Sequence, residues 1–472
     1  MSALRERYEL AVIGAGPAGL AAATSAAGLG IDSVLLDEQP APGGQIFRAI
    51  TETPVRARAV LGADYWRGGP LVERFRASTA HYVAGAAVWS VAPGGEIGVS
   101  IDGAAHLIQA RHIILATGAL ERPMPIPGWT LPGIMTVGAA QILLKASGLV
   151  AQAPIVLAGS GPLLFLFAAQ HLAAGGALAA LLDTTPRSNW WAAAPHLPAF
   201  LASRYAAKGA RLIAAVRRRA RVVGNVTALR AEGDGRLETV VYRRGDGPEQ
   251  RVASSLLLLH QGVVPQLNLA LAAGCRPIWD DAQLCFRPAI DEWGASEIAG
   301  IAVTGDGAGI AGAEAAELRG RLAALDAAHR VGRIDRAARD QAAASDRAAL
   351  ARWTRGRAFL DRLYRPARQF RVPDGDTIVC RCEEVTARQV RDAVALGVAG
   401  PNQMKAFLRC GMGPCQGRLC GLTVHALIAD ARGVSPAEIG YYRLRPPVKP
   451  ITLAELASLP KSDAALKAVA RG

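Results

Sequence analysis

The stretch Glu9-Leu-Ala-Val-Ile-Gly14-Ala-Gly16-Pro17-Ala18-Gly19 decides the fold of the first part of this chain. It joins a short apolar strand to three spaced glycines, and an alanine-rich helix is expected from Leu20 to Gly28. A second apolar strand, Ile31 to Leu36, ends at the acidic pair Asp37 and Glu38. Strand, glycines, helix, strand and acid in this order are the fingerprint of a dinucleotide-binding βαβ unit.

Each part of this fingerprint has a chemical task. The glycines permit a tight turn, the close approach of a pyrophosphate, and tight packing of the helix on the sheet. The phosphates lie at the helix N-terminus, and the acidic pair can hold the ribose hydroxyls. We therefore predict that an adenine dinucleotide binds here. The predicted contacts are Gly14, Gly16, Pro17, Ala18, Gly19, Asp37 and Glu38.

Three further motifs are expected to line the same ligand. A glycine pair follows the second strand, where it suits a backbone that passes close to a flat ligand; an ordinary turn is the alternative. One buried strand from Ile113 ends in Ala-Thr-Gly, and another from Ile301 ends in Gly-Asp. The late aspartate is placed to accept a hydrogen bond from a flavin ribityl chain, so we predict FAD. The additional contacts are Gly44, Gln45, Thr117, Gly118, Gly305 and Asp306.

A degraded copy of the first unit begins at Pro154. The glycine turn recurs as Gly159-Ser-Gly161, and the following strand leads to Asp183, which favours NAD over NADP. The third glycine is replaced by Leu164, so helix and strand cannot approach as closely. A nicotinamide nucleotide, another nucleotide such as ATP, or a scaffold without a ligand all remain open here. His260, at the end of a later strand, is expected to be structural rather than catalytic.

Five of the seven cysteines fall between Cys380 and Cys420, and this density favours a metal site. A [2Fe–2S] cluster needs two thiolates on each iron. The Cys380/Cys382 pair suits one iron, and a second pair across an intervening helix suits the other. Thr386 and Gln389 predict a capping box for that helix, and another helix is expected from Gln416 to Asp430. A zinc site, or a lapsed site kept as core, is the alternative.

The cysteine stretch resembles the bacterioferritin-associated-ferredoxin type of [2Fe–2S] domain, in the form fused to flavoprotein dehydrogenases. The shared pattern is C-x-C followed by G-M-G-x-C-Q-G-x-x-C. This resemblance implies that Cys380, Cys382, Cys415 and Cys420 hold the cluster, with Cys410 as a spectator.

The order of the two glycine turns and the late Gly-Asp motif resembles glutathione and thioredoxin reductases. That resemblance implies an α/β fold with two Rossmann-like domains, the FAD domain being split around the other, plus a small helical [2Fe–2S] domain. No pair of cysteines in either Rossmann unit has the spacing of a redox-active disulfide. The predicted domains are 1–120 with 266–330 (FAD), 121–265 (NAD(P)-like), 331–372 (helical linker), 373–433 ([2Fe–2S]) and 434–472 (docking tail).

Composition narrows the class of protein. The net charge is +14, but the arginines are dispersed and no aromatic-and-basic motif appears, so nucleic-acid binding is not predicted. The N-terminus shows no signal peptide. The apolar run from Pro154 to Leu182 contains glycines and polar residues, so it reads as strand–turn–helix–strand rather than as a membrane span. We expect a soluble cytoplasmic protein, with peripheral attachment to the inner membrane left open.

Nearly the whole chain resembles one group of proteins, and the resemblance is most distinctive in three segments, 121–133, 260–265 and 441–450. They resemble the α (A) subunits of opine oxidases, the B subunit of hydrogen cyanide synthase, and dye-linked proline and D-hydroxyproline dehydrogenases. This implies an electron-relay subunit. A separate flavin-containing β subunit oxidises the C–N bond of an opine, imino acid or amino acid, and electrons pass to a quinone or dye-type acceptor. FMN at a subunit interface and a small ferredoxin-like γ subunit occur among relatives. A self-contained NAD(P)H-dependent flavoprotein and a nucleotide-binding scaffold are the alternatives.

Overall fold

The structure, a computed structural model, describes residues 4–459. Its first sheet has the strand order β3-β2-β1-β6-β5-β4, with β19 also paired to β6. The strands are β1 (Arg7–Ile13), β2 (Ser33–Asp37), β3 (His81–Ala84), β4 (Ala87–Val91), β5 (Glu96–Ile101), β6 (Ala104–Leu115) and β19 (Ile301–Val303). The second half of β6 lies between β1 and β19 in parallel register, while its first half forms an antiparallel hairpin with β5. The parallel part, β3-β2-β1-β6-β19, is a Rossmann-like half-sheet.

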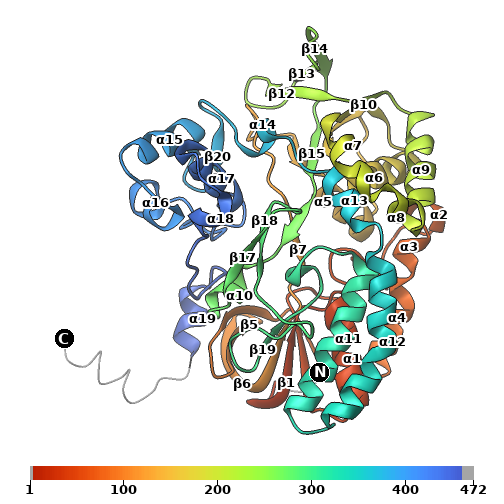
Figure 1. Cartoon of the computed structure of the whole chain (residues 1–472), viewed down its shortest axis with the longest axis vertical. Helices are drawn as coiled ribbons and strands as arrows, with labels where there is room; N and C mark the ends of the chain where they lie inside the picture. The colour runs from red at the N-terminus through yellow and green to blue at the C-terminus, as the bar shows by residue number, and fades with distance from the viewer. Residues whose placement is uncertain (1–3, 460–472) are drawn as a thin grey trace.

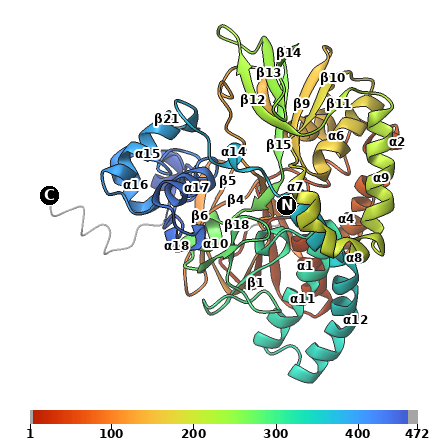
Figure 2. The ribbon, with the colours of Figure 1, turned by 45° about the horizontal axis from the view of Figure 1, so that its top comes forward.

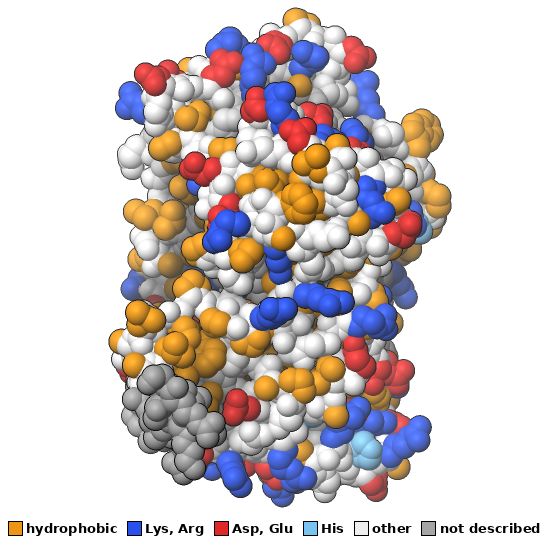
Figure 3. All heavy atoms as spheres, turned by 90° about the vertical axis from the view of Figure 1, so that its left-hand side faces the viewer, with side chains coloured by type: hydrophobic (Ala, Val, Ile, Leu, Met, Phe, Trp, Pro, Cys, Tyr) orange, Lys and Arg blue, Asp and Glu red, His pale blue; other side chains and the backbone are white. Residues whose placement is uncertain are grey.

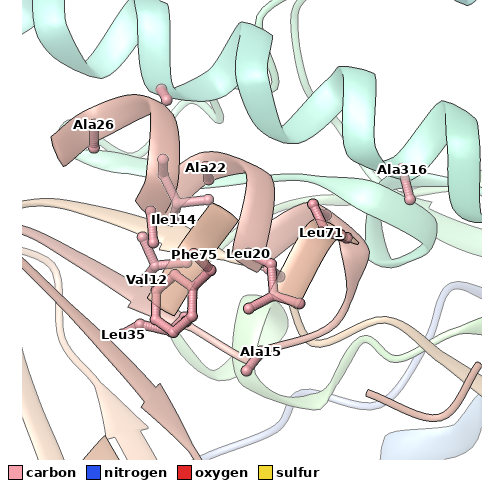
Figure 4. Close-up of a cluster of buried hydrophobic side chains, with 14 of the residues drawn as sticks. Val12, Ala15, Leu20, Ala22, Ala26, Leu35, Leu71, Phe75, Ile114 and Ala316 are labelled. Carbon is pink, nitrogen blue, oxygen red and sulfur yellow. The ribbon is translucent and has the colours of Figure 1, made fainter. Parts of the chain in front are cut away.

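Helices α1 (Pro17–Gly28) and α11 (Ala313–Arg330) pack side by side on this sheet. Figure 4 shows why the alanine-rich sequence suits them: Ala22 and Ala26 of α1 lie between the strand side chain of Ile114 and the facing helix. Small side chains let the two helices approach closely. A Cβ atom at Gly320 of α11 would overlap the backbone carbonyl of Ala18, so that glycine is required by packing.

Replacing Gly320 with alanine is therefore expected to destabilise the protein by about 1–3 kcal/mol, the range for overpacking a filled core. The matched control is Gly209→Ala in helix α9 (Arg204–Arg217), where an added Cβ meets nothing within 4 Å. There alanine should leave stability unchanged or raise it slightly, because glycine is a poor helix former. Urea unfolding of both variants checks this, and equal stabilities for the two variants would contradict the packing account.

The second sheet has the order β11-β10-β9-β15-β8, and all of its pairs are parallel. Its strands are β8 (Ile134–Thr136), β9 (Ile155–Ser160), β10 (Leu178–Asp183), β11 (Val222–Val223) and β15 (Leu257–Gln261). Helices α5 (Val137–Ser147), α6 (Pro162–Ala173) and α9 accompany it. In Figure 2, the antiparallel strands β12 (Val226–Glu232), β13 (Thr239–Arg244) and β14 (Glu249–Ala253) extend away from the first sheet. The parallel part of the first sheet and the fully parallel second sheet, each accompanied by helices, confirm the predicted α/β class.

Figure 1 shows a third body beside the two sheets, which we call the cysteine region (residues 378–439). It contains β20 (Ile378–Cys380), β21 (Val385–Thr386), α15 (Ala387–Ala395), α16 (Pro401–Leu408), α17 (Gly421–Arg432) and α18 (Pro436–Ile439). Its core includes Leu267, just before α10 (Asn268–Ala272), and Leu271 within that helix. It also includes Phe286 of β18 (Cys285–Pro288). We call the part of the chain built on the first sheet the first lobe and the part built on the second sheet the second lobe. The cysteine region is thus packed against the first lobe through shared apolar side chains.

Several local predictions are confirmed and others are wrong. The capping box of Thr386 and Gln389 is present, and α12 (Arg336–Thr354) matches the predicted linker helix. Residues 154–182 form β9, α6 and the start of β10, and no helix within residues 4–459 is long and apolar enough to cross a membrane. The polar sequence of residues 51–76 predicts irregular structure, but the segment contains α2 (Arg58–Leu61), α3 (Ala63–Trp66) and α4 (Gly68–Arg76). The sequence-based prediction overlooked the helical spacing of Leu71, Val72 and Phe75, whose buried side chains hold α4 on the core.

The predicted helix from Gln416 also begins later than expected. Helix α17 starts at Gly421, so Cys420 rather than Cys415 stands at its N-terminal cap. Gln416 has a left-handed φ of 49° and belongs to the preceding turn. In the tail, the sequence from Thr452 to Ala457 predicts a helical turn, which is present as α19 (Leu453–Ser458). Residues 460–472 of the predicted docking tail lie outside the described part of the chain.

Charge on the surface is mixed rather than segregated. On the face shown in Figure 3, Lys and Arg side chains are interspersed with Asp and Glu, and hydrophobic side chains form small groups between them. Many of the arginines form surface ion pairs, such as Arg230 with Glu249 and Arg388 with Asp376. The net charge of +14 is therefore not gathered into a single basic patch on this face.

Candidate cofactor sites

The first glycine turn closes tightly at the carboxyl ends of β1 and β6. A Cβ atom at Gly14 would lie 2.6 Å from the carbonyl oxygen of Ala116, and one at Gly19 would overlap the carbonyl of Gly14. Gly16 caps helix α1. Gly44 has a φ of 61°, and a Cβ there would lie 2.7 Å from the Cα atom of Gly16. The two predicted glycine motifs therefore come together as one backbone-lined cradle.

Asp37 lies at the end of β2 beside this cradle. Its side chain is buried, and one carboxylate oxygen, Oδ2, has no hydrogen-bond partner. Burial raises the pKa of Asp37 to about 6, although hydrogen bonds from the backbone N–H groups of Gln39 and Ala15 act in the opposite direction. An unsatisfied buried acceptor costs free energy unless a ligand completes it. A ribose hydroxyl at this position would supply the missing donor, so the residues present fit the adenosine part of FAD.

The remaining predicted flavin contacts gather at the same edge of the sheet. A Cβ atom at Gly307 would lie 3.4 Å from the Gly118 carbonyl oxygen, so the Gly-Asp turn adjoins the Ala-Thr-Gly turn. The Asp306 Oδ1 atom accepts hydrogen bonds from the N–H groups of Ala311 (2.8 Å) and Gly312 (3.1 Å), which fixes its side chain before helix α11. Oδ2 is left for a further donor.

Lys145 was not predicted from the sequence. It projects from helix α5, and its Nζ donates to the carbonyl oxygens of Gln45 (3.3 Å) and Ile46 (2.9 Å) and to the side chain of Gln141 (2.9 Å). Burial lowers its pKa to about 7. This lysine ties the second lobe to the glycine pair of the first. It stands in an ordinary amphipathic helix, so nothing in the local sequence could have marked it.

In the second unit, each predicted nucleotide contact has a structural task. Gly161 stands at the N-terminal cap of α6 with a φ of 112°, a conformation that favours glycine. A Cβ at Gly159 would overlap the His260 carbonyl, so that glycine permits β9 and β15 to pair. Asp183 accepts a hydrogen bond from the N–H of Thr185 at 2.9 Å. His260 is buried, and its Nδ1 lies 2.5 Å from Glu121, whose other oxygen accepts from Gly138 at the start of α5. His260 therefore has a structural partner, as expected, and Glu121 is that partner, a role that the sequence did not reveal.

The five clustered cysteines come together in the cysteine region. The thiol of Cys380 is in hydrogen-bonding contact with those of Cys410 and Cys420, and the thiol of Cys415 contacts those of Cys420 and Cys382. The four predicted ligands therefore follow one another in the order Cys382, Cys415, Cys420, Cys380, and Cys410 joins at the Cys380 end. Cys382 is exposed, whereas Cys380, Cys410 and Cys420 are buried.

Hydrogen bonds from neighbouring thiols set the charge of this group. Those from Cys410 and Cys420 hold the pKa of Cys380 well below its usual range, and the hydrogen bond from Cys420 lowers the pKa of Cys415. The pKa of Cys410 is raised, above all by its hydrogen bond to Cys380. Within residues 4–459, no group of three or more His, Cys, Asp or Glu side chains is arranged to hold a metal ion.

Glycines and Tyr442 enclose the loop between α16 and α17, residues 409–420, which we call the cysteine loop. A Cβ atom at Gly413 would overlap the side chain of Cys382. The ring of Tyr442 lies against Gly411 and Gly417, so that a Cβ at either position would come within 3.0 Å of it. Tyr442 is 2 % exposed. The G-M-G-x-C-Q-G pattern thus reflects a loop that must pass beneath an aromatic ring.

A short hydrogen-bonded bridge joins the cysteine loop to the Ala-Thr-Gly turn. The Nδ2 of Asn268 donates to the carbonyl oxygen of Gln416 (2.8 Å), and the N–H of Asn268 donates to the side chain of Gln266 (3.0 Å). The N–H of Gln266 then donates to the carbonyl oxygen of Gly118 (3.0 Å), while Thr117 Oγ1 donates to the Gln266 carbonyl (3.2 Å). The two candidate cofactor sites are therefore neighbours. Asn268, at the start of α10, was missed because this contact exists only in the folded chain.

Comparisons with known proteins identify the family. The family model described as pyridine nucleotide-disulphide oxidoreductase matches residues 8–332, and the sarcosine oxidase A3 domain matches residues 374–459. The chain is 49% identical to the A subunit of opine oxidase from Agrobacterium tumefaciens (strain Ach5), over 99% of this chain and 94% of the relative. It is 33% identical to the HcnB subunit of hydrogen cyanide synthase from Pseudomonas aeruginosa, over 95% of this chain and 98% of the relative.

A solved structure supports the fold. The crystal structure of L-proline dehydrogenase from P. horikoshii superposes with a TM-score of 0.70 at 19% identity, over 96% of this chain and 81% of that one. With the matches above, this establishes an oxidoreductase with an FAD-binding dehydrogenase fold. The chain belongs to the family of opine oxidase A subunits.

Proposed function

We propose that this chain is the FAD- and [2Fe–2S]-containing electron-transfer subunit of a heteromeric dehydrogenase or oxidase. The observation that carries the proposal is the hydrogen-bonded bridge from Gly118 through Gln266 and Asn268 to Gln416. It joins the Ala-Thr-Gly turn of the predicted flavin site to the loop that carries Cys415 and Cys420, two of the four predicted cluster ligands. Electron transfer between two cofactors requires such proximity, whereas a scaffold that binds a nucleotide for stability alone does not.

In this proposal Cys380, Cys382, Cys415 and Cys420 hold the cluster, and Cys410 remains a spectator. A [2Fe–2S] cluster takes two thiolates on each iron and accepts one electron. Its four cysteine ligands are therefore shared between two iron atoms, and three side chains need not converge on a single metal ion. The contacts that join the four thiols in sequence support this ligand set. Arg418 lies close to Cys415, and its guanidinium offsets negative charge at the thiolates.

At the first site, the Gly14–Gly19 turn and Gly44 would hold the pyrophosphate of FAD. The Asp37 carboxylate would bind the adenosine ribose, and the free oxygen of Asp306 would bind the ribityl chain. The bound flavin would supply the two-electron to one-electron conversion that a cluster partner needs. The chain's own contribution is to hold the flavin and the cysteine loop at a fixed separation.

We infer that the C–N bond is oxidised on a separate flavin-containing β subunit, and that electrons leave to a quinone or dye-type acceptor. The relatives named as the A subunit of opine oxidase and the alpha subunit of sarcosine oxidase are parts of heteromeric enzymes, which supports a partner. FMN at the interface, a ferredoxin-like γ subunit, and a cytoplasmic location with attachment to the inner membrane are part of the same proposal. Co-purification with the products of neighbouring genes, followed by dye reduction with opines and imino acids, tests it; full oxidation by this chain alone would contradict it.

A self-contained NAD(P)H-dependent reductase is the second candidate, because β9, α6 and β10 retain the glycine turn and the acidic strand end. We expect no bleaching of the bound flavin by millimolar NADH in stopped-flow measurements. The reason is that Gly159 and Asp183 already have structural tasks, and Leu164 is fully buried where a third glycine would allow closer packing. Rapid bleaching by NADH, with photoreduction of the same sample as the positive control, would favour the reductase instead.

A further inference from the structure

The C-terminal tail crosses from the cysteine region to the first sheet. Tyr442 covers the cysteine loop, and Val448 is then fixed on both sides. Its carbonyl oxygen accepts from Arg418 Nη2 at 2.7 Å, and its N–H donates to the carbonyl oxygen of Trp89 in β4 at 2.9 Å. Val448 is 2 % exposed and packs in the core of the first sheet. The position of the next residue, Lys449, is therefore well determined.

Lys449 reaches the acidic end of β2. Its Nζ forms an ion pair with Glu38, and Asp37 is near enough to act electrostatically on it. The other cation that faces Asp37 is Arg48, whose guanidinium bonds the side chains of Gln39 and Gln45. Asp37 and Glu38 are the two residues that the dinucleotide fingerprint assigns to the ribose. A residue from the far end of the chain thus stands at the adenosine end of the glycine cradle.

We propose that Lys449 is an FAD-binding residue supplied by the tail, acting at the adenosine ribose through Asp37 and Glu38. The proposal rests on the proposed binding of FAD at the first site. Two adjacent carboxylates repel each other, and burial opposes the ionisation of Asp37. An ammonium group beside both of them favours the ionised carboxylate, which accepts ribose hydroxyl hydrogen bonds more strongly than a neutral acid does. The tail would thereby complete a site whose other parts lie in the first 120 residues and near residue 306.

The test is the dissociation constant of FAD for the full chain after removal of flavin, measured by quenching of flavin fluorescence. Lys449→Gln should weaken binding about tenfold, the effect of losing one charge-assisted interaction, and Lys449→Arg should restore most of it. The matched control is Arg445→Gln, an exposed cation four residues earlier in the same tail, which should leave the constant unchanged. ADP carries only the adenosine half of FAD. Its ability to compete with FAD should therefore fall in Lys449→Gln by a similar factor.

Iron content and the electron paramagnetic resonance signal of each variant provide the second readout. In Lys449→Gln both should match the parent chain, because Tyr442 still covers the cysteine loop. The proposal would be overturned if Lys449→Gln left the affinity for FAD unchanged. It would also be overturned if this variant bound FAD more tightly, because the lysine would then compete with FAD for the site. Joint loss of flavin and iron would overturn it too, because that result would assign Lys449 to general docking of the tail. If the parent chain itself binds no FAD, the proposed function fails instead.

Discussion

Replacing Cys415 with serine is expected to remove nearly all iron from the purified chain while flavin stays bound. Cys415 lies between Cys382 and Cys420 in the chain of thiol contacts, so its loss interrupts the predicted ligand set in the middle. A cluster that has lost one of four thiolates is poorly held, because serine is a much weaker ligand for iron. Iron, acid-labile sulfide and flavin are measured on the same anaerobically reconstituted sample.

Two controls make this result specific. Cys410→Ser removes a buried thiol from the same core and should retain the cluster, since Cys410 is the predicted spectator. Cys275→Ser removes a buried thiol in the core of the first sheet and should also retain it. If Cys415→Ser retained iron and Cys410→Ser lost it, Cys410 would be the cluster ligand and Cys415 the spectator. Stoichiometric zinc in the parent chain would support the alternative metal site.

Asp37→Asn is expected to have two large and opposite effects. Burial raises the pKa of Asp37 from 3.8 to about 6 in the folded chain, so ionising this carboxyl costs about 3 kcal/mol more there than in the unfolded chain. Asparagine retains the acceptor for the N–H groups of Gln39 and Ala15 and removes the charge. The flavin-free variant should therefore be more stable than the parent by as much as about 3 kcal/mol at pH 7. Its affinity for FAD should nevertheless fall by about 10- to 100-fold, because hydrogen bonds to a charged acceptor are lost.

The effect of Asp37 on the stability of the flavin-free chain should depend on pH, with a sign that follows from its raised pKa. Because the folded-state pKa is the higher one, the folded chain binds more protons than the unfolded chain between about pH 4 and pH 6. The contribution of Asp37 to stability is therefore neutral below about pH 4, becomes unfavourable as the pH rises to about 6, and stays constant above. Urea unfolding of the flavin-free parent and of Asp37→Asn across this range should show a difference that grows and then levels off. A difference independent of pH would contradict the assignment.

The parts of the fold that follow local rules could be predicted from the sequence. The strand, glycines and helix around Gly14 are set by steric demands that leave few alternatives, and the capping box at Thr386 is a contact between residues three apart. Helix α4 was missed because its apolar spacing over Leu71, Val72 and Phe75 is short. The start of α17 was misplaced because the left-handed Gln416 is held by a distant side chain, Asn268.

In the candidate site, too, the residues that belong to local motifs could be predicted, and those defined by tertiary contacts could not. Its glycines, acidic residues and cysteines form motifs, and the structure brings them to two adjoining places. Three further residues make tertiary contacts at those places, namely Lys145, Asn268 and Lys449. Each is a single polar side chain in an otherwise ordinary segment, and its partner lies in a different lobe or at the other end of the chain. Local sequence cannot reveal such a residue, because its role is created by tertiary packing.

The most direct test of the central claim is a combined visible and electron paramagnetic resonance spectrum of the anaerobically purified chain, before and after reduction with dithionite. We expect flavin absorbance that bleaches on reduction, together with a rhombic signal that appears only in the reduced sample and corresponds to one [2Fe–2S] cluster per flavin. A colourless chain, or a flavin-containing chain with no iron signal after reconstitution, would contradict the claim.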